Sequence, residues 1–194
     1  MDKMMFADRY GLTAEVKAGH KLRSRRICKE QYWSFSDLVN ANENQSFMFE
    51  IPRYKIGDIV AVAQRYSDFM DADETLFRLN PKTGNIIRQT AIQHKGWKNK
   101  MFVAAEIMPC RIRITNVRVE RLKDITDEEC IKEGLTMWQL RGKRYYGFFD
   151  SVRENFFRYS TPREAFAALI DLIAGNGTWA SNPYVFVYEF ELIK

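Results

Sequence analysis

Residues 111–122 read RIRITNVRVERL, and this stretch decides the fold that the sequence predicts. Its two isoleucines alternate with arginines, which is the pattern of a strand with one buried face. The two valines that follow continue the alternation in the opposite phase. A change of phase inside a strand indicates one extra residue, so we expect a β-bulge near Thr115 and Asn116.

Working outward, other local patterns predict further strands. The apolar run at 59–62 and the alternating run at 183–193 each predict a strand, and we interpret the aromatic residues of the second run as core. The segments 77–79 and 86–88 flank the turn cluster NPKTGN and predict a hairpin. Residues 4–6 predict a short first strand.

Three helices are expected from their end signals. Asp8 as N-cap, followed by apolar residues at helical spacing, predicts a helix that stops at Gly19. The capping boxes TDEE at 126–129 and TPRE at 161–164 predict two more, each ending at the next glycine. Residues 30–52 lack periodicity and are expected to be irregular. Strands with interspersed helices imply one α+β domain around a mostly antiparallel, barrel-like sheet.

The composition excludes several classes of protein. With 46% hydrophobic and 28% charged residues, the 194-residue chain has the balance of a folded domain. It has two histidines, three cysteines without a C-x-x-C spacing, and no HExxH, Walker or GxGxxG pattern, so we expect no metal and no organic cofactor. No signal-peptide core occurs, and no apolar run approaches the roughly 18 residues of a membrane span, so we expect a cytoplasmic protein without membrane contact.

The positive charge is concentrated in one segment. Residues 17–29 contain six of the 30 Lys and Arg residues and no acid, which leaves 24 basic and 25 acidic groups in the rest of the chain. A basic segment on a nearly neutral body indicates an anionic ligand at one site.

This segment contains the sequence GHKLRSRR at 19–26, which has the form G-x-K-x-x-S-R-R. It resembles the G-x-K-x-x-T-x-R signature of the ASCH domain family. Three further stretches resemble landmarks of that family in the correct order: IGDIVAV at 56–62, RVERL through ITDEECIKEG across 118–134, and NPYVFVYEF at 182–190. The last stretch is similar to the closing strand of the larger, often phage-encoded members.

The resemblance implies a fold and a partner. The fold is a PUA-like, mostly antiparallel β-barrel with flanking helices, formed as a single domain over 1–194 with insertions near 28–53, 67–96 and 137–160. Family members are associated with RNA binding, and the ligand cleft is lined by the 19–26 segment.

The resemblance also implies site residues. Some small family members hydrolyse the N4-acetyl group of acetylcytidine with a lysine, a threonine and a glutamate, and by motif position these roles fall on Lys21, Ser24 and Glu133. The binding residues that it implies are Gly19, Arg23, Arg25, Arg26 and Gln64.

The chemistry of the three candidate catalytic residues sets conditions on the structure. A serine hydroxyl becomes a nucleophile only when a base takes its proton, and a lysine is such a base only after burial or nearby cations lower its pKa from about 10.4. The arginines of the segment supply cations. Lys21 and Ser24 are three positions apart, so they share a side in a helical turn but not in a strand. We expect Lys21→Ala to abolish turnover and to leave folding intact.

Non-catalytic roles fit the same residues. Lys21 then contacts a phosphate, Ser24 caps a turn and Glu133 forms an ion pair at a helix end. A separate stretch, RGKRYY at 141–146, interleaves cations with aromatic residues as single-strand binding surfaces do, and it equally fits a solvated loop whose tyrosines pack.

Two functions follow from the sequence. The first is binding of RNA or a modified nucleoside, with an affinity that falls as salt rises and with Arg26→Ala flattening that dependence. The second is a metal-independent amidohydrolase that acts on N4-acylated cytidine-type nucleosides. The oligomeric state stays open.

Overall fold

The computed structural model describes residues 1–28, 52–79 and 84–193. The predicted irregular segment 30–52 except its last residue, most of the expected insertion near 28–53 and most of the NPKTGN turn lie outside the described residues. The described chain is a mixed α+β structure, as the sequence predicts.

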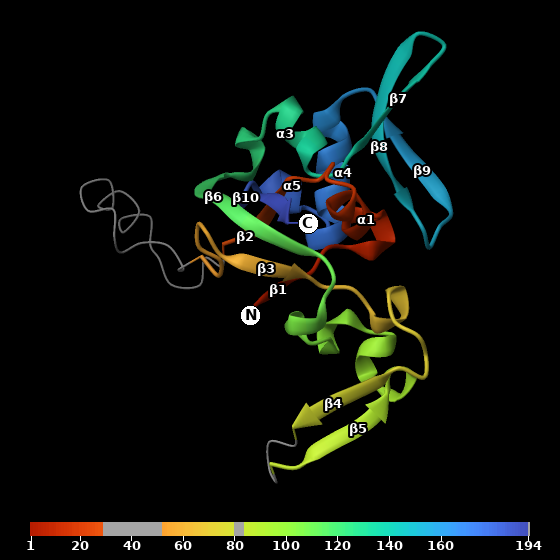
Figure 1. Ribbon diagram of the computed structural model, residues 1–194. Coiled ribbons are helices and arrows are strands. Elements are labelled where there is room, and N and C mark those ends of the chain that lie inside the picture. The colour runs from red at the N-terminus through yellow and green to blue at the C-terminus, as the bar shows by residue number, and fades with distance from the viewer. Residues whose placement is uncertain (29–51, 80–83, 194) are drawn as a thin grey trace, which may run out of the picture.

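A five-stranded sheet forms the centre of the molecule (Figure 1). Neighbouring strands are antiparallel except the first pair, which is parallel. The strands predicted at 59–62, 111–122 and 183–193 are all present, and the short first strand lies slightly earlier than predicted. In sheet order the strands are β1 (Lys3–Met4), β3 (Ile59–Val62), β6 (Arg111–Arg121), β10 (Tyr184–Ile193) and β2 (Arg23–Ile27).

The predicted bulge in β6 is confirmed. Glu189 of β10 pairs with Asn116, whereas the next residue, Phe190, pairs with Ile114, so Thr115 is the extra residue. The bulge lets both halves of β6 turn apolar side chains toward the core on either side of the phase change.

The C-terminal strand β10 lies between β6 and β2, inside the sheet. Of its aromatic residues, Phe186, Tyr188 and Phe190 are buried, as predicted, whereas Tyr184 is only partly buried. Val185 and Val187, on the opposite face, are buried as well. The prediction missed this second buried face because alternation indicates which residues share a face, not whether both faces are covered.

The described strands form an open sheet. Its edges are β1 and β2, and neither pairs with the other in the described part of the chain. Closure into a barrel therefore stays a prediction.

The capping boxes mark helix starts as predicted. The hydroxyls of Thr126 and Thr161 each accept a hydrogen bond from the backbone N–H three residues on, at 3.2 Å. The first helix is shorter than predicted, because Asp8 begins a 3₁₀ turn and the α-helix starts only at Leu12. The α-helices are α1 (Leu12–Lys17), α3 (Asp127–Lys132), α4 (Pro162–Ala174) and α5 (Thr178–Ser181). The 3₁₀ helices are η1 (Asp8–Tyr10), η2 (Tyr66–Asp68), η3 (Ala91–Gln93), η4 (Lys95–Trp97), η5 (Lys100–Phe102), η6 (Ala105–Ile107) and η7 (Leu122–Asp124).

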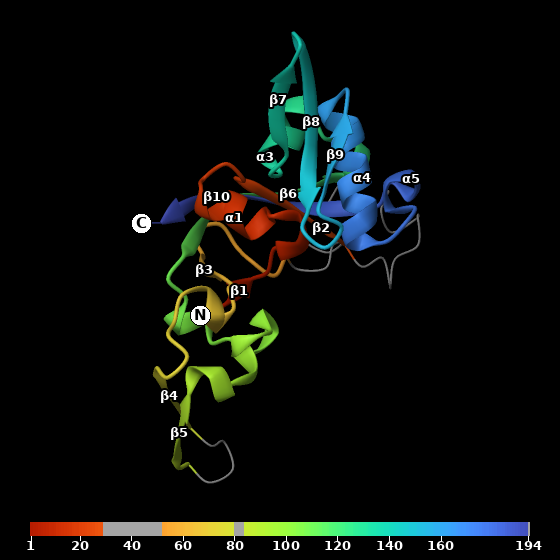
Figure 2. The same cartoon turned by 90° about the vertical axis from the view of Figure 1, so that its right-hand side faces the viewer.

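Two smaller sheets project from opposite ends of the molecule (Figures 1 and 2). One is the predicted hairpin, β4 (Thr75–Leu79) and β5 (Ile86–Thr90). The other contains β7 (Thr136–Leu140), β8 (Lys143–Asp150) and β9 (Asn155–Tyr159), and α4 packs against its last two strands. None of the helices in the described ranges is both long and apolar enough to span a bilayer.

Candidate functional site

Five of the eight predicted site residues line one small cavity beside β2, with a volume of about 60 Å³. The turn before β2, β2 itself and the end of α3 supply its polar lining: Lys21, Ser24, Arg25, Arg26 and Glu133. Apolar walls come from Phe6 and Leu12 and from Phe166, Leu169 and Ile170 of α4.

Two glycines with positive φ shape this cavity. Gly19, with φ of 76°, ends the first helix and turns the chain toward β2. Gly134, with φ of 97°, follows α3, and a Cβ there would lie 3.1 Å from Leu12 and 3.3 Å from Lys21. A glycine at 134 therefore leaves room for the Lys21 side chain.

Lys21 and Glu133 form a buried ion pair at the cavity. The ammonium of Lys21 donates one hydrogen bond to the Glu133 carboxylate at 2.7 Å and another to the Glu133 carbonyl at 2.6 Å. The two residues are only 3% and 4% exposed. The expectation that Lys21→Ala leaves folding intact did not foresee this pair, since removing Lys21 takes one of two cationic partners from a buried carboxylate.

The pKa of Lys21 shifts in the direction that base catalysis requires, whereas its partner Glu133 stays ionised and opposes that shift. Burial lowers the pKa of Lys21 and outweighs the opposing attraction of Glu133. Burial alone would raise the pKa of Glu133, but Lys21 and Arg25 together hold it below its usual range. The carboxylate of Glu133 also forms an ion pair with Arg25, whose Nη1 lies 2.8 Å from Glu133 Oε1. The attraction of Glu133 raises the pKa of Lys21 by less than burial lowers it.

Ser24 brings an unused hydroxyl to the same cavity. The residue lies in β2 and is 5% exposed, and its side chain has no hydrogen-bond partner among the described residues. Lys21 lies in the turn before β2, which is how both residues reach one cavity although Ser24 is in a strand. Lys21 uses two of its three N–H groups on Glu133 and does not donate to Ser24.

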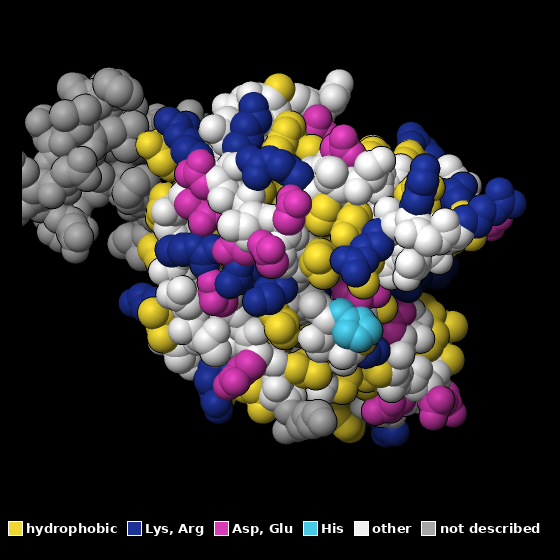
Figure 3. Space-filling view, turned by 90° about the horizontal axis from the view of Figure 1, so that it is seen from above, with side chains coloured by type: hydrophobic (Ala, Val, Ile, Leu, Met, Phe, Trp, Pro, Cys, Tyr) yellow, Lys and Arg dark blue, Asp and Glu magenta, His cyan; other side chains and the backbone are white. Residues whose placement is uncertain are grey.

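Two arginines of the basic segment, Arg23 and Arg25, are paired with glutamates from β6, α3 and β10. Arg25 Nη2, for example, lies 2.6 Å from Glu120 Oε1 and 2.8 Å from Glu129 Oε2. Seen from above, acidic and basic side chains interleave on this part of the surface (Figure 3). The network contains Arg23, Arg25 and Arg118 with Glu120, Glu129 and Glu189, beside the Lys21–Glu133 pair. Three of the six cations of residues 17–29 therefore have carboxylate partners in the fold.

Arg26 differs from its neighbours in having no carboxylate partner in the described parts of the chain. Its Nη2 donates to the carbonyl of Met5 at 2.6 Å, and its guanidinium lies 5.9 Å from the ring centre of Phe6. Burial lowers the pKa of Arg26. Arg26 is thus the cavity cation whose charge is least compensated.

The remaining three predicted binding residues do not line the cavity. Gly19 serves the turn, and Arg23 points into the ion-pair network. Gln64 is 1% exposed, and neither polar atom of its amide has a partner in the part of the chain that the structure describes.

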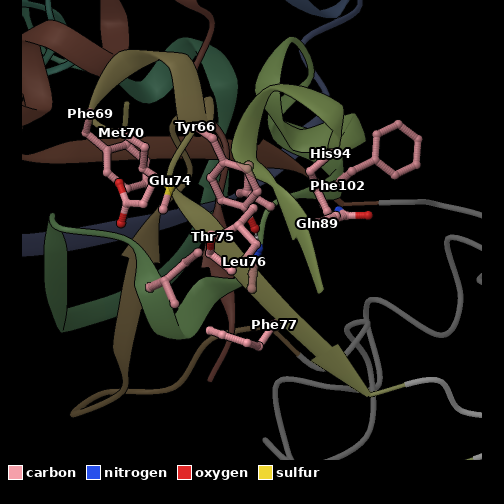
Figure 4. Close-up of a pocket in the computed structure, with 13 residues that line it drawn as sticks. Tyr66, Phe69, Met70, Glu74, Thr75, Leu76, Phe77, Gln89, His94 and Phe102 are labelled. Atoms are coloured by element: carbon pink, nitrogen blue, oxygen red, sulfur yellow. Dashed lines mark hydrogen bonds between the residues drawn. The ribbon is translucent and has the colours of Figure 1, made fainter. Parts of the chain in front are cut away.

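Sequence reasoning missed the apolar walls and a second cavity. The α4 residues are apolar at helical spacing, which indicates a buried face without indicating that a cavity opens there. The second cavity, of about 610 Å³, shares no lining residue with the first. In Figure 4, Phe69 and Glu74 lie on one side of it and His94 and Phe102 on the other.

No group of three or more His, Cys, Asp or Glu residues with the arrangement of a metal site occurs among the described residues. Comparisons of the chain with protein-family models, with curated proteins and with solved structures find no match. The functional argument therefore depends on the geometry of the chain itself.

Proposed function

We propose that this protein is a PUA-like domain of the ASCH type that binds RNA or a modified nucleoside through the Lys21–Ser24–Glu133 cavity. The observation that carries the proposal is convergence: Glu133 is 112 positions from Lys21 in sequence, yet both line one cavity with Ser24. These are the positions that the ASCH-like motifs single out.

The size of the cavity favours a small polar group as its ligand. One water needs about 10–15 Å³, and pockets that enclose whole small molecules measure about 300–1,000 Å³. The cavity, at about 60 Å³, suits the edge or substituent of a base, with sugar and phosphate left outside. The Ser24 hydroxyl and the third Lys21 N–H are the polar groups that meet it.

A second candidate function is hydrolysis of an N4-acylated cytidine-type nucleoside, and the lowered pKa of Lys21 beside an unpaired hydroxyl favours it. Ser24 Oγ attacks the acyl carbonyl while Lys21, in its neutral amine form, takes the hydroxyl proton. The C–N bond then breaks, the N4 nitrogen leaves with that proton, and water releases the acyl group from Ser24. Glu133 positions Lys21, both as the base that takes the proton and as the acid that gives it to the N4 nitrogen.

The test combines binding and product analysis for one set of variants. Native protein, Ser24→Ala and Ser24→Thr are titrated with cytidine, N4-acetylcytidine and a short single-stranded RNA, and acetate and cytidine are followed by chromatography. Ser24→Ala is a clean variant, because the hydroxyl that it removes has no partner among the described residues. Ser24→Thr restores the hydroxyl.

Nucleoside binding that is lost in Ser24→Ala and restored in Ser24→Thr supports the binding function. Acetate release with the same dependence on Ser24 supports the hydrolase. Absence of nucleoside binding and of turnover in the native protein overturns both.

A further inference from the structure

The three-stranded sheet β7–β8–β9 has one face turned away from the rest of the molecule. The strand register places Trp138 opposite Tyr145, and Phe149 opposite Phe156. Gly147 pairs with Thr136 on one side and with Arg158 on the other. Since side chains alternate along a strand, these residues and Lys143 share one face, called here the outer aromatic face.

The other face of the same sheet belongs to the core. There Phe148 is 1% exposed and stacks on Phe157 with ring centres 5.3 Å apart, and α4 packs over both strands. On the outer aromatic face, in contrast, Phe149 and Phe156 are 42% and 45% exposed. Phe149 and Phe156 are therefore available to a ligand, and Trp138 and Tyr145 are partly exposed beside them.

The rings of this face surround a hollow. Trp138 and Phe156 meet with centres 5.1 Å apart, and Phe149 lies 5.4 Å from Phe156. Beside these rings a hollow of about 300 Å³ opens, lined by Thr136, Trp138, Phe156 and Arg158. That volume is at the lower end of the range for small-molecule pockets, about 300–1,000 Å³.

Charge distinguishes this surface from the basic segment at 17–29. Residues 136–160 contain five Lys or Arg and two acids, and one of those acids, Asp150, is held on the inner face by Arg9. Lys143 and Arg158 are exposed, and neither has an ion-pair partner among the described residues. Figure 3 shows Lys and Arg side chains gathered on the right, where this sheet lies.

The hairpin tip adds to this charge. Arg141 and Gly142 form the two-residue turn between β7 and β8, both with positive φ, so Arg141 stands at the end of the projecting ribbon. The residues that the strand register places on the outer aromatic face include no carboxylate.

Exposed rings with unpaired cations and no carboxylate match single-stranded nucleic acid, whose bases stack on aromatic side chains while its phosphates meet Lys and Arg. We propose that the outer aromatic face binds single-stranded nucleic acid, with Trp138 and Phe156 stacking on a base in the hollow and Lys143 and Arg158 contacting adjacent phosphates. This proposal does not depend on the Lys21 cavity. A duplex is excluded as the preferred ligand because its bases are already stacked on one another.

The experiment measures the fluorescence anisotropy of labelled oligouridine and oligothymidine of about 12 nucleotides, and of a duplex of equal length. The native protein should bind the single strands more tightly than the duplex, and more weakly as salt rises. Trp138→Ala and Phe156→Ala should each weaken single-strand binding by about 5- to 150-fold, the range for loss of one stacked base. Trp138→Phe should keep most of the affinity.

A matched pair of arginines tests the phosphate contacts without touching the core. Arg158 lies on the outer face and Arg144 on the opposite face, and both are exposed without an ion pair among the described residues. Arg158→Gln should reduce the slope of log affinity against log salt by about 0.7, the value for one phosphate contact on a single strand. Arg144→Gln should leave the slope unchanged.

Ser24→Ala separates this proposal from the proposed function, because it should abolish binding in the cavity and leave the loss of oligonucleotide affinity caused by Trp138→Ala or Phe156→Ala as large as it was. Three results overturn the proposal: equal affinity for duplex and single strand, no single-strand binding, or unchanged binding in folded Trp138→Ala together with equal salt slopes for Arg158→Gln and Arg144→Gln.

Discussion

The ammonium of Lys21 donates to both the carboxylate and the backbone carbonyl of Glu133, at 2.7 and 2.6 Å. The two contacts join the turn before β2 to the residue that follows α3, and both residues line the candidate site. A binding cavity and a buried ion pair are thus built from the same atoms, so substitutions here change stability and function together.

We expect Lys21→Met to lower the free energy of unfolding by about 3 kcal/mol, because loss of one partner leaves a buried charge uncompensated. The cost stays at the lower end of the range for buried pairs, since Arg25 still contacts Glu133. Urea denaturation near neutral pH measures it. The control is Lys17→Met on the exposed side of α1, with a change within about 0.5 kcal/mol. Equal stabilities of the two variants would contradict the assignment of Lys21 as a structural ion-pair partner.

Asp150 should give the protein an acid-sensitive contact. Its two carboxylate oxygens accept hydrogen bonds from Arg9 Nε and Nη2, each at 2.8 Å, and these lower its pKa from 3.8 to about 2. Because the pKa of Asp150 is lower in the folded state than in the unfolded state, ionised Asp150 stabilises the folded protein at pH values above about 4. This stabilisation is lost as the pH falls from about 4 through 2.

Asp150→Asn should therefore be less stable than the native protein near neutral pH, and the difference should shrink steadily below pH 4. Thermal unfolding across this pH range measures the difference. Asp73→Asn, at an exposed position, serves as the control with no such trend. A stability difference that is constant with pH would show that Asp150 is not held ionised by Arg9.

The buried amide of Gln64 should lower the free energy of unfolding of the native protein. This amide has no partner among the described residues, and an unpaired buried polar group costs about 1–3 kcal/mol. We expect Gln64→Met to raise the free energy of unfolding by about 1 kcal/mol. The exposed Gln139→Met should change it little. Nucleoside affinity measured on the same variant decides its role: a loss keeps Gln64 among the binding residues, and no change removes it.

Deletion of Thr115 should be far more damaging than its replacement. Without the extra residue, the half of β6 before the bulge changes face, and Ile112 and Ile114 turn out of the core. Exposing two such side chains costs about 3–6 kcal/mol, whereas Thr115→Val keeps the bulge and should cost under about 1 kcal/mol. Circular dichroism during chemical denaturation distinguishes the two outcomes. A deletion variant as stable as the native protein would show that the register is not set by this residue.

Local patterns in the sequence were enough to predict the elements whose causes are local. The bulge at Thr115 follows from a phase change among neighbouring side chains, and the starts of α3 and α4 follow from hydroxyls that bond an N–H three residues away. The mixed α+β class follows from the order of these elements. In the first helix the local signal at Asp8 was insufficient, because the chain forms a 3₁₀ turn there before α1.

The sequence by itself also determined that basic residues cluster near position 21. Only the tertiary structure decided which carboxylates pair with them. The segment 17–29 has no acid of its own, and the glutamates that neutralise Arg23 and Arg25 come from β6, α3 and β10. In the same way, Trp138 and Phe156 form one surface only because β8 lies between their strands. Long-range pairing determines both results, since the energy of an ion pair or a stacked ring depends on distance in space, and separation along the chain does not reveal that distance.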